Sequence, residues 1–155
     1  MKTNVLMVCL GNICRSPLAE GILASKVDPE KVWVDSAGTA GYHVGRPPDP
    51  RSIAVARSHG LDISNQRCRR FSPLDFERFD YIYVMDQKNL SDLLDLATSP
   101  EDAQKVQLLL DVLGTNSEEV PDPYYGGTDS FEKVFQRIDA ACEAIAKNMG
   151  DSGRR

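Results

Sequence analysis

The sequence has no long apolar segment. Its longest apolar run near the N-terminus, residues 5–10, is too short for the core of a signal peptide, and no stretch approaches the ~20 residues of a membrane span. We therefore expect a cytoplasmic protein. Of the 155 residues, 41% are hydrophobic and 26% are charged, which excludes the collagen-like, disordered and membrane classes.

Basic residues are too few for a surface that binds polyanions. The 18 Lys and Arg residues are outnumbered by 23 Asp and Glu residues, so the net charge is -5 and the pI is near 5.0. Broad contact with nucleic acid or with an anionic membrane requires a surplus of positive charge on one face. Neither partner is expected, and any anion site must be local.

Paired cysteines and a nucleotide-binding loop are also missing. The chain has four cysteines: Cys9, Cys14, Cys68 and Cys142. Their spacing matches neither paired C-x-x-C zinc motifs nor the disulfide framework of a small secreted protein. The sequence also lacks G-x4-G-K-[ST], the Walker motif. Reduced thiols are therefore expected, and a single cysteine in an unusual local setting becomes a candidate functional group.

Apolar patterns predict alternating strands and helices. Strands are predicted at residues 5–9, 32–34, 81–85 and 106–110, and the last of these could instead begin a helix. Helices are predicted from Ser16 as N-cap with Pro17 at the first helical position, at 53–59, and at 90–97. Such alternation indicates βαβ units and an α/β fold with a parallel sheet.

The last helix shows the clearest periodicity. One helical face carries Phe131, Val134, Phe135, Ile138, Cys142 and Ile145. This spacing predicts a helix whose apolar face packs on the core. The polar residues 150–155 are expected to form a frayed tail.

The segment from Cys9 to Ser16 has the form C-x5-R-S and lies between a predicted strand and a predicted helix. In open α/β sheets, ligands bind beyond the carboxyl ends of the strands. A loop at a helix N-terminus turns several backbone N–H groups inward, and together with the helix dipole they bind a tetrahedral oxyanion. Gly11 is expected to permit the tight curvature.

Two side chains of this loop suggest phosphoryl transfer. The inward N–H groups favour the thiolate form of Cys9, which makes it the candidate nucleophile. The planar guanidinium of Arg15 can bind two equatorial oxygens of a phosphoryl group and follow them into the transition state. The alternative is a buried thiol at a strand end and a solvated arginine at a helix start. The setting between strand and helix favours the functional interpretation.

A phosphocysteine mechanism also needs an acid to protonate a leaving phenolate. Asp122 is the candidate, because it lies in a segment stiffened by proline, residues 120–126. The rings of Tyr124 and Tyr125 would form a wall for a flat aromatic substrate. The alternative is a simple turn in which the aspartate and the prolines serve only the backbone.

Three segments resemble motifs of the low-molecular-weight protein tyrosine phosphatase family. Residues 8–17 are similar to its phosphate loop, residues 35–38 to the end of its second strand, and residues 122–126 to its acid loop. The resemblance covers nearly the whole chain. It implies one domain at 1–149, with a four-stranded parallel sheet and helices on both faces, no metal and no cofactor. The implied substrates are phosphotyrosine-containing proteins or aryl phosphates. The resemblance also implies the roles argued above for Cys9, Arg15 and Asp122.

The resemblance also implies roles that the pattern alone does not mark. Asn12 shapes the loop by hydrogen bonding, Ser36 supports Asn12, and Ser16 helps the thiolate to leave in the second step. The implied phosphate- and substrate-binding residues are Leu10, Gly11, Asn12, Ile13, Cys14, Ser16, Tyr42, Tyr124 and Tyr125. Two positions depart from some members: Asn65 replaces a histidine that supports the loop asparagine, and Tyr42 replaces a tryptophan that bears on phosphopeptide preference.

Two other functions fit parts of the pattern. An arsenate reductase on the same fold would also use Cys9, but it needs a closely spaced downstream cysteine pair, which Cys68 and Cys142 do not form. A protein that binds phosphotyrosine without turnover would usually have lost the nucleophile or the acid, and both are present here.

Cys14 is expected to protect Cys9 from irreversible oxidation. A loop curled around a phosphate-sized anion brings its ends together, so the two Cα atoms could fall within the ~4.4–6.8 Å that a disulfide requires. Cys14 would then condense with a sulfenic acid at Cys9. The alternative is that Cys14 packs beneath the loop as a small hydrophobe.

Overall fold

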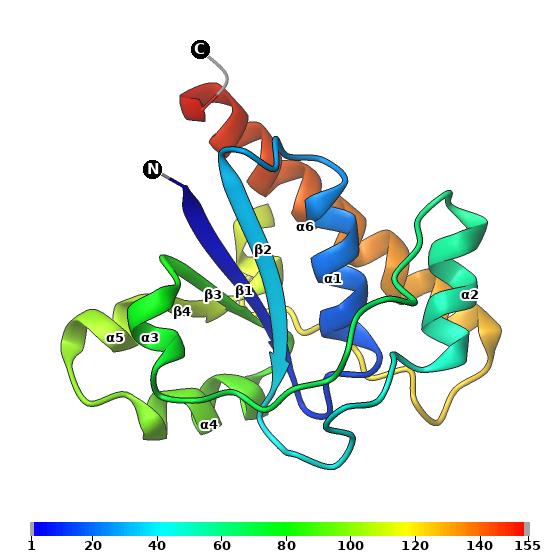
Figure 1. Ribbon diagram of the computed structural model, residues 1–155, viewed down its shortest axis with the longest axis horizontal. Helices are drawn as coiled ribbons and strands as arrows, with labels where there is room; N and C mark the ends of the chain where they lie inside the picture. The colour runs from blue at the N-terminus through cyan, green and yellow to red at the C-terminus, as the bar shows by residue number, and fades with distance from the viewer. Residues whose placement is uncertain (1, 154–155) are drawn as a thin grey trace.

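The computed structural model describes residues 2–153, which form a parallel sheet between two layers of helices (Figure 1). The strands are β1 (Thr3–Cys9), β2 (Val32–Gly38), β3 (Tyr81–Val84) and β4 (Val106–Leu108). They lie in the order β2-β1-β3-β4, and each neighbouring pair is parallel. The predicted α/β fold, a four-stranded parallel sheet with helices on both faces, is confirmed.

The helices fall into two groups on opposite sides of the sheet. Their bounds are α1 (Arg15–Ala24), α2 (Pro50–Ser58), α3 (Asp75–Arg78), α4 (Gln87–Leu96), α5 (Pro100–Gln104), the 3-10 helix η1 (Leu109–Leu113) and α6 (Thr128–Gly153). Helices α1, α2 and α6 lie on one side, and α3, α4 and α5 lie on the other (Figure 1). None of the helices within residues 2–153 combines the length and apolar character that a membrane crossing requires.

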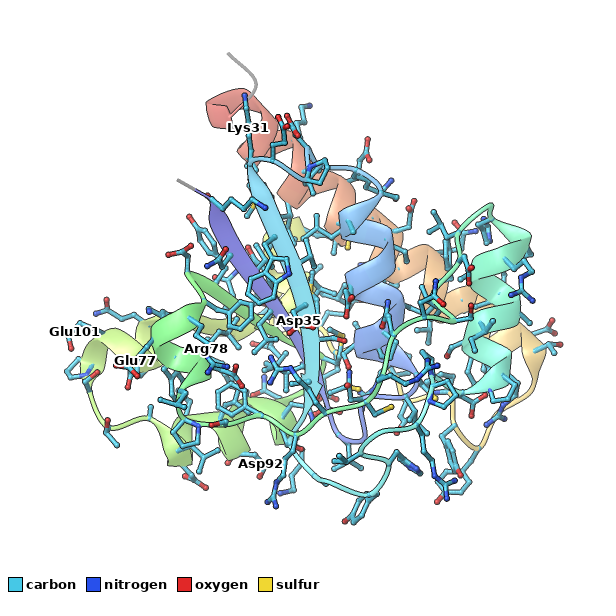
Figure 2. All side chains as sticks on the ribbon, viewed as in Figure 1. Lys31, Asp35, Glu77, Arg78, Asp92 and Glu101 are labelled. Atoms are coloured by element: carbon cyan, nitrogen blue, oxygen red, sulfur yellow. The ribbon has the colours of Figure 1, made fainter. Side chains whose placement is uncertain are left out.

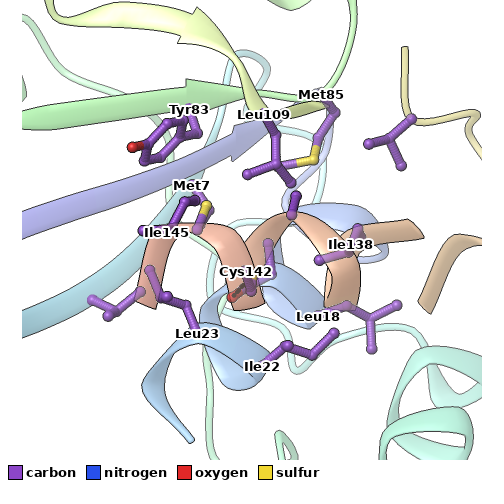
Figure 3. Packing of buried hydrophobic residues seen from close by; sticks show 14 of the residues in the cluster. Met7, Leu18, Ile22, Leu23, Tyr83, Met85, Leu109, Ile138, Cys142 and Ile145 are labelled. Atoms are coloured by element: carbon purple, nitrogen blue, oxygen red, sulfur yellow. Dashed lines mark hydrogen bonds between the residues drawn. The ribbon is translucent and has the colours of Figure 1, made fainter. Parts of the chain in front are cut away.

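The larger core lies between the sheet and helices α1 and α6 (Figure 3). Met7 and Tyr83 of the sheet face Leu18 of α1 and Ile138 of α6 across this core. All the residues predicted for the apolar face of the last helix are buried: Phe131, Val134, Phe135, Ile138, Cys142 and Ile145. The amphipathic pattern therefore predicted the packed face correctly, although the helix begins at Thr128 rather than at Phe131.

A smaller core covers the other face of the sheet. Leu6 and Ile82 point to this side because successive residues of a strand face opposite sides. They pack with Phe76 of α3 and Leu93 of α4. The exposed Glu77 lies at the outer edge of this layer (Figure 2). With both faces covered, the carboxyl ends of the strands are the part of the sheet left to form a site.

The start of α1 differs from the prediction. Cys14, not Ser16, is the N-cap residue, and its side chain makes no capping hydrogen bond. The Ser16 hydroxyl instead lies 3.0 Å from Cys9 Sγ and accepts a 2.8 Å hydrogen bond from Asn12 Nδ2. The Ser16 hydroxyl therefore binds residues of the loop and does not cap the helix.

The fourth strand is shorter than predicted: it ends at Leu108 and not at residue 110. The chain continues as η1, whose Leu109 and Leu110 are fully buried in the larger core. An unbroken run of buried leucines has no period that could distinguish strand from helix. At the other end of the chain, α6 is helical through Gly153, and residues 154–155 lie outside the described part, so the frayed tail stays a prediction.

Candidate active site

A cleft of about 280 Å³ opens at the end of β1. It is lined by Cys9, Leu10, Gly11, Ile13, Cys14, Arg15, Tyr42, His43, Asp122, Tyr124 and Tyr125. The three candidate catalytic residues thus share one cleft, although one of them comes from a loop late in the chain. Sequence reasoning missed His43, one of the lining residues, because no motif or spacing marked it.

The loop between β1 and α1 turns at Asn12, which has a left-handed backbone with φ of 58°. Asparagine tolerates this region better than most residues. Gly11, by contrast, has no positive φ, so its backbone does not require glycine on that ground, and the role expected for it in the curvature stays a prediction. A Cβ atom at Gly11 would lie 3.1 Å from Cδ2 of His43, so a larger residue there would require the His43 ring to shift.

The Asn12 side chain is buried and joins three parts of the structure. Its Nδ2 donates to Ser16 Oγ at 2.8 Å and to Ser36 Oγ at 3.0 Å, and its Oδ1 accepts from the Arg69 N–H at 2.9 Å. Asn65 is exposed, and the support expected from a histidine at that position comes from the Arg69 backbone. The side chains of Asn12 and Ser16 are buried beneath the loop backbone. Neither residue lines the cleft, although both were expected among the phosphate- and substrate-binding residues.

Cys9 lies at the bottom of the cleft with 3% of its surface exposed. Its Sγ is 3.0 Å from Ser16 Oγ and 3.5 Å from the Ser16 backbone N–H. Both groups can donate a hydrogen bond to a sulfur that carries negative charge. The geometry therefore suits a thiolate at this position.

Arg15 is buried, yet three acceptors surround its guanidinium. Nη1 donates to Asp86 Oδ2 at 2.7 Å and to the Val120 carbonyl at 3.0 Å, while Nη2 lies 3.7 Å from Asp122 Oδ2. Burial alone would lower the pKa of Arg15, but the negative charges of Cys9 and Asp86 raise it above its ordinary value. Asp86 was not predicted as a site residue, although its place directly after the third strand was a usable signal.

The loop that carries Asp122 forms a tight turn at the rim. The Tyr124 N–H donates to Asp122 Oδ1 at 3.0 Å, and the Gly126 N–H donates to the Pro123 carbonyl at 2.8 Å. The Asp122 side chain is 45% exposed, so one carboxylate oxygen is fixed while the group stays open to the cleft. Tyr125 is 95% exposed and stands at the outer edge of the site.

A carboxylate that sequence reasoning missed supports the loop from below. Ser36 Oγ donates to Glu20 Oε1 at 2.6 Å, which extends the chain of hydrogen bonds from Asn12 to helix α1. The pKa of Glu20 is raised from 4.5 to about 7, chiefly by burial and to a lesser extent by Asp35, against the opposing effects of Ser36 and Arg69. Asp35 lies on β2 (Figure 2) and pairs with Arg69 at 3.1 Å.

The other thiols are buried and free. Burial, with Asp49 as the next cause, raises the pKa of Cys14 to about 12. Cys68 donates to the Asn12 carbonyl beneath the loop, whereas Cys142 lies in the larger core. Among the described side chains, no group of three or more His, Cys, Asp or Glu residues is placed to bind a metal ion.

Comparison with known proteins agrees with this geometry. Residues 4–154 match the profile of a family described as low molecular weight phosphotyrosine protein phosphatase. The chain belongs to this family. A low molecular weight protein-tyrosine-phosphatase of Bacillus subtilis is 41% identical over 150 residues, which cover 94% of this chain and 95% of the relative.

Solved structures extend the family match to the whole fold. A protein tyrosine phosphatase of Entamoeba histolytica, crystallised with Hepes in its active site, matches with a TM-score of 0.89 and 37% identity, covering 99% of this chain and 100% of the other. Wzb of Vibrio vulnificus, in complex with benzylphosphonate, matches with a TM-score of 0.85 and 32% identity, covering 96% and 99% of the two chains. As a member of the phosphatase family, this protein is a hydrolase of phosphoric monoesters.

The raised pKa of Glu20 predicts a pH-dependent contribution to stability. Because the folded protein holds this proton more tightly than the unfolded chain, the stabilisation is complete below pH 4.5 and is lost as the pH rises to about 7. Glu20→Gln keeps an acceptor for Ser36 but cannot ionise. Urea unfolding at pH 5, 6, 7 and 8 should therefore show wild type losing at most about 3 kcal/mol more than the variant across this range. Parallel curves for the two proteins would contradict this assignment.

Proposed function

We propose that this phosphatase hydrolyses phosphotyrosine in proteins through a cysteinyl-phosphate intermediate. Cys9 is the nucleophile, Arg15 binds the phosphoryl group and stabilises the transition state, and Asp122 is the general acid and base. The observation that carries the proposal is the convergence of these three side chains in one cleft. The inward-facing loop, the buried guanidinium and the rim carboxylate supply the three functions that the reaction needs.

In the first step, the thiolate of Cys9 attacks phosphorus and the bond from phosphorus to the phenol oxygen breaks. Asp122 gives its proton to that oxygen, so tyrosine leaves as a neutral phenol. Arg15 and the loop N–H groups hold the equatorial oxygens as they flatten. Because Nη1 of Arg15 already donates to Asp86 and Val120, the guanidinium is oriented before substrate binds.

In the second step, water attacks the phosphorus of the phosphocysteine and the bond between sulfur and phosphorus breaks. Asp122, now a carboxylate, accepts a proton from the water. The Ser16 hydroxyl and backbone N–H, at 3.0 and 3.5 Å, stabilise the departing thiolate of Cys9. Inorganic phosphate leaves and the enzyme returns to its starting state.

The walls of the cleft support an aromatic substrate. Leu10 and Ile13 contribute apolar surface, and Tyr42, Tyr124 and Tyr125 contribute rings. A flat phenyl group between such walls gains both burial and ring contacts. The related Wzb structure contains benzylphosphonate, a phosphonate that carries a phenyl ring, which is consistent with this substrate class.

The rival activities are less well supported. Arsenate reduction would require thiols that relay a disulfide outward, but Cys68 and Cys142 are buried in separate places, one beneath the loop and one in the larger core. A binding protein without turnover would not need an exposed carboxylate held beside Arg15, which Asp122 provides.

We predict that Cys9→Ser abolishes turnover while vanadate or phosphate binding remains. A serine hydroxyl is scarcely ionised at neutral pH, so it cannot replace the thiolate as nucleophile. Hydrolysis of p-nitrophenyl phosphate and vanadate binding, measured on the same preparation, separate loss of chemistry from loss of fold. Activity near wild type would rule out the covalent mechanism.

Asp122→Asn should lower kcat/KM for phenyl phosphate by ~10²–10⁴, the span expected when a general acid is lost. The loss should shrink for phosphates of more acidic phenols, because a good leaving group needs no proton. A series of substituted aryl phosphates measures this dependence. An equal loss for every leaving group would show that Asp122 is not the acid of the first step.

We also propose that Cys14 protects Cys9 from irreversible oxidation by peroxide. Both thiols line the same cleft, and Cys14 has only 4% of its surface exposed. Peroxide would convert Cys9 to a sulfenic acid, and attack by Cys14 would form the disulfide with loss of water. With a pKa of about 12, Cys14 is mostly a thiol at pH 7, so the condensation should accelerate as the pH rises.

The protection is tested by peroxide treatment followed by a thiol reductant. Wild type should regain most of its own starting activity and yield a peptide in which Cys9 and Cys14 are linked, detected by mass spectrometry. Cys14→Ser should regain little of its own starting activity, because its sulfenic acid oxidises further. Equal fractional recovery in the two proteins would show that Cys14 is only a packing residue.

A further inference from the structure

Arg51, near the start of α2, contacts the acid loop although it does not line the cleft. Its Nη1 donates to the Gly126 carbonyl at 3.3 Å. The guanidinium carbon also lies 5.5 Å from the centre of the Tyr124 ring and 4.6 Å from that of Phe131. One side chain therefore holds the turn at residues 123–126 by a hydrogen bond and by contact with aromatic faces.

The other side of the guanidinium is held by Asp49. Nε of Arg51 lies 3.1 Å from Asp49 Oδ1, and Nη2 lies 3.0 Å from Oδ2, which is a two-point contact. The same carboxylate caps α2 by accepting from the Arg51 backbone N–H at 2.8 Å. Burial would raise the pKa of Asp49, but these bonds lower it, so the carboxylate stays ionised.

The start of α2 is fixed in turn to the phosphate loop. The Asp49 backbone N–H donates to the Ile13 carbonyl at 2.8 Å, and Ser52 Oγ donates to the Cys14 carbonyl at 3.3 Å. Arg51 therefore lies between two loops that are far apart in the sequence. One loop carries the nucleophile, and the other carries the acid.

We propose that Arg51 is a positioning residue that sets where Asp122 stands relative to Cys9. It acts through Tyr124, because its guanidinium packs on the Tyr124 ring and the Tyr124 N–H binds Asp122 Oδ1. This inference rests on the acid role proposed for Asp122. A carboxyl group displaced by a fraction of an ångström from the leaving oxygen loses much of its catalytic effect.

The role requires arginine rather than any cation. A planar guanidinium can bind two carboxylate oxygens along one edge while its faces pack on rings, whereas the ammonium of lysine is a point charge. Arg51→Lys therefore keeps the charge beside Asp49 but loses the two-point contact. Arg57 provides a matched control, because it is an exposed arginine of the same helix, 3.9 Å from Asp62 and outside the cleft.

The test measures kcat/KM for aryl phosphates whose leaving phenols range from phenol to p-nitrophenol. We expect Arg51→Met to lower the value for phenyl phosphate by about tenfold to a hundredfold, the scale of a misplaced catalytic group, and to affect p-nitrophenyl phosphate much less. Arg51→Lys should show the same trend with a smaller loss. Arg57→Met should leave the whole series unchanged. Phosphate binding and the Tm, measured for each variant, confirm that the loop and the fold are intact.

A double variant distinguishes positioning from a general structural effect. In the Asp122→Asn background, Arg51→Met should change kcat/KM by less than about twofold, because residues that act through one group are not additive. Equal loss for all leaving groups, or full additivity with Asp122→Asn, would overturn the proposal. If Arg51→Met fails to fold, Arg51→Lys decides by the same two criteria.

The same measurements separate this inference from the proposed function. If Asp122→Asn alone shows no dependence on the leaving group, the acid role of Asp122 fails and the positioning role fails with it. If Asp122→Asn shows the dependence and the Arg51 variants do not, only the positioning role is overturned.

Discussion

The left-handed backbone of Asn12 is the constraint on which the site depends. A residue other than glycine in this region carries strain of about 1–3 kcal/mol, and it persists only where its surroundings hold it. Three partners do so here: Ser16 of α1, Ser36 of β2 and the N–H of Arg69. Because the turn at Asn12 reverses the chain over the start of α1, it also brings Ser16 beside the sulfur of Cys9.

Close packing around the loop leaves little freedom for other conformations. A Cβ atom at Gly38 would lie 2.8 Å from the Leu10 carbonyl and 3.1 Å from the Asn12 N–H nitrogen, so the end of β2 must be glycine for the loop to sit where it does. Below the loop, Ser36 joins Asn12 to Glu20. The candidate anion site is therefore built by the sheet and by α1 together.

Local patterns predicted what local physics determines. The apolar run before Cys9, the spacing to Arg15 and the periodicity of α6 each reflect one element and its immediate neighbours. The contact of Arg51 with the acid loop could not be found in this way, because it joins residues 75 positions apart in the sequence. Asp86 follows the third strand directly, which is a local signal, but its pairing with Arg15 across 71 positions is not. The break at Leu109 was missed for another reason: residues buried on all sides show no alternation, so the sequence cannot distinguish the end of a strand from the start of a helix.

The cleft of this acidic chain is suited to an anion because the buried guanidinium of Arg15 is held in one orientation. Both bonds from Nη1 of Arg15 are taken by Asp86 and the Val120 carbonyl, which leaves the edge formed by Nε and Nη2 to meet two oxygens of a phosphoryl group. Asp122 lies 3.7 Å from Nη2, so under the proposed mechanism the proton donor stands beside this edge. The contacts that orient Arg15 therefore fix the edge of the guanidinium that would receive the phosphoryl group under the proposed function.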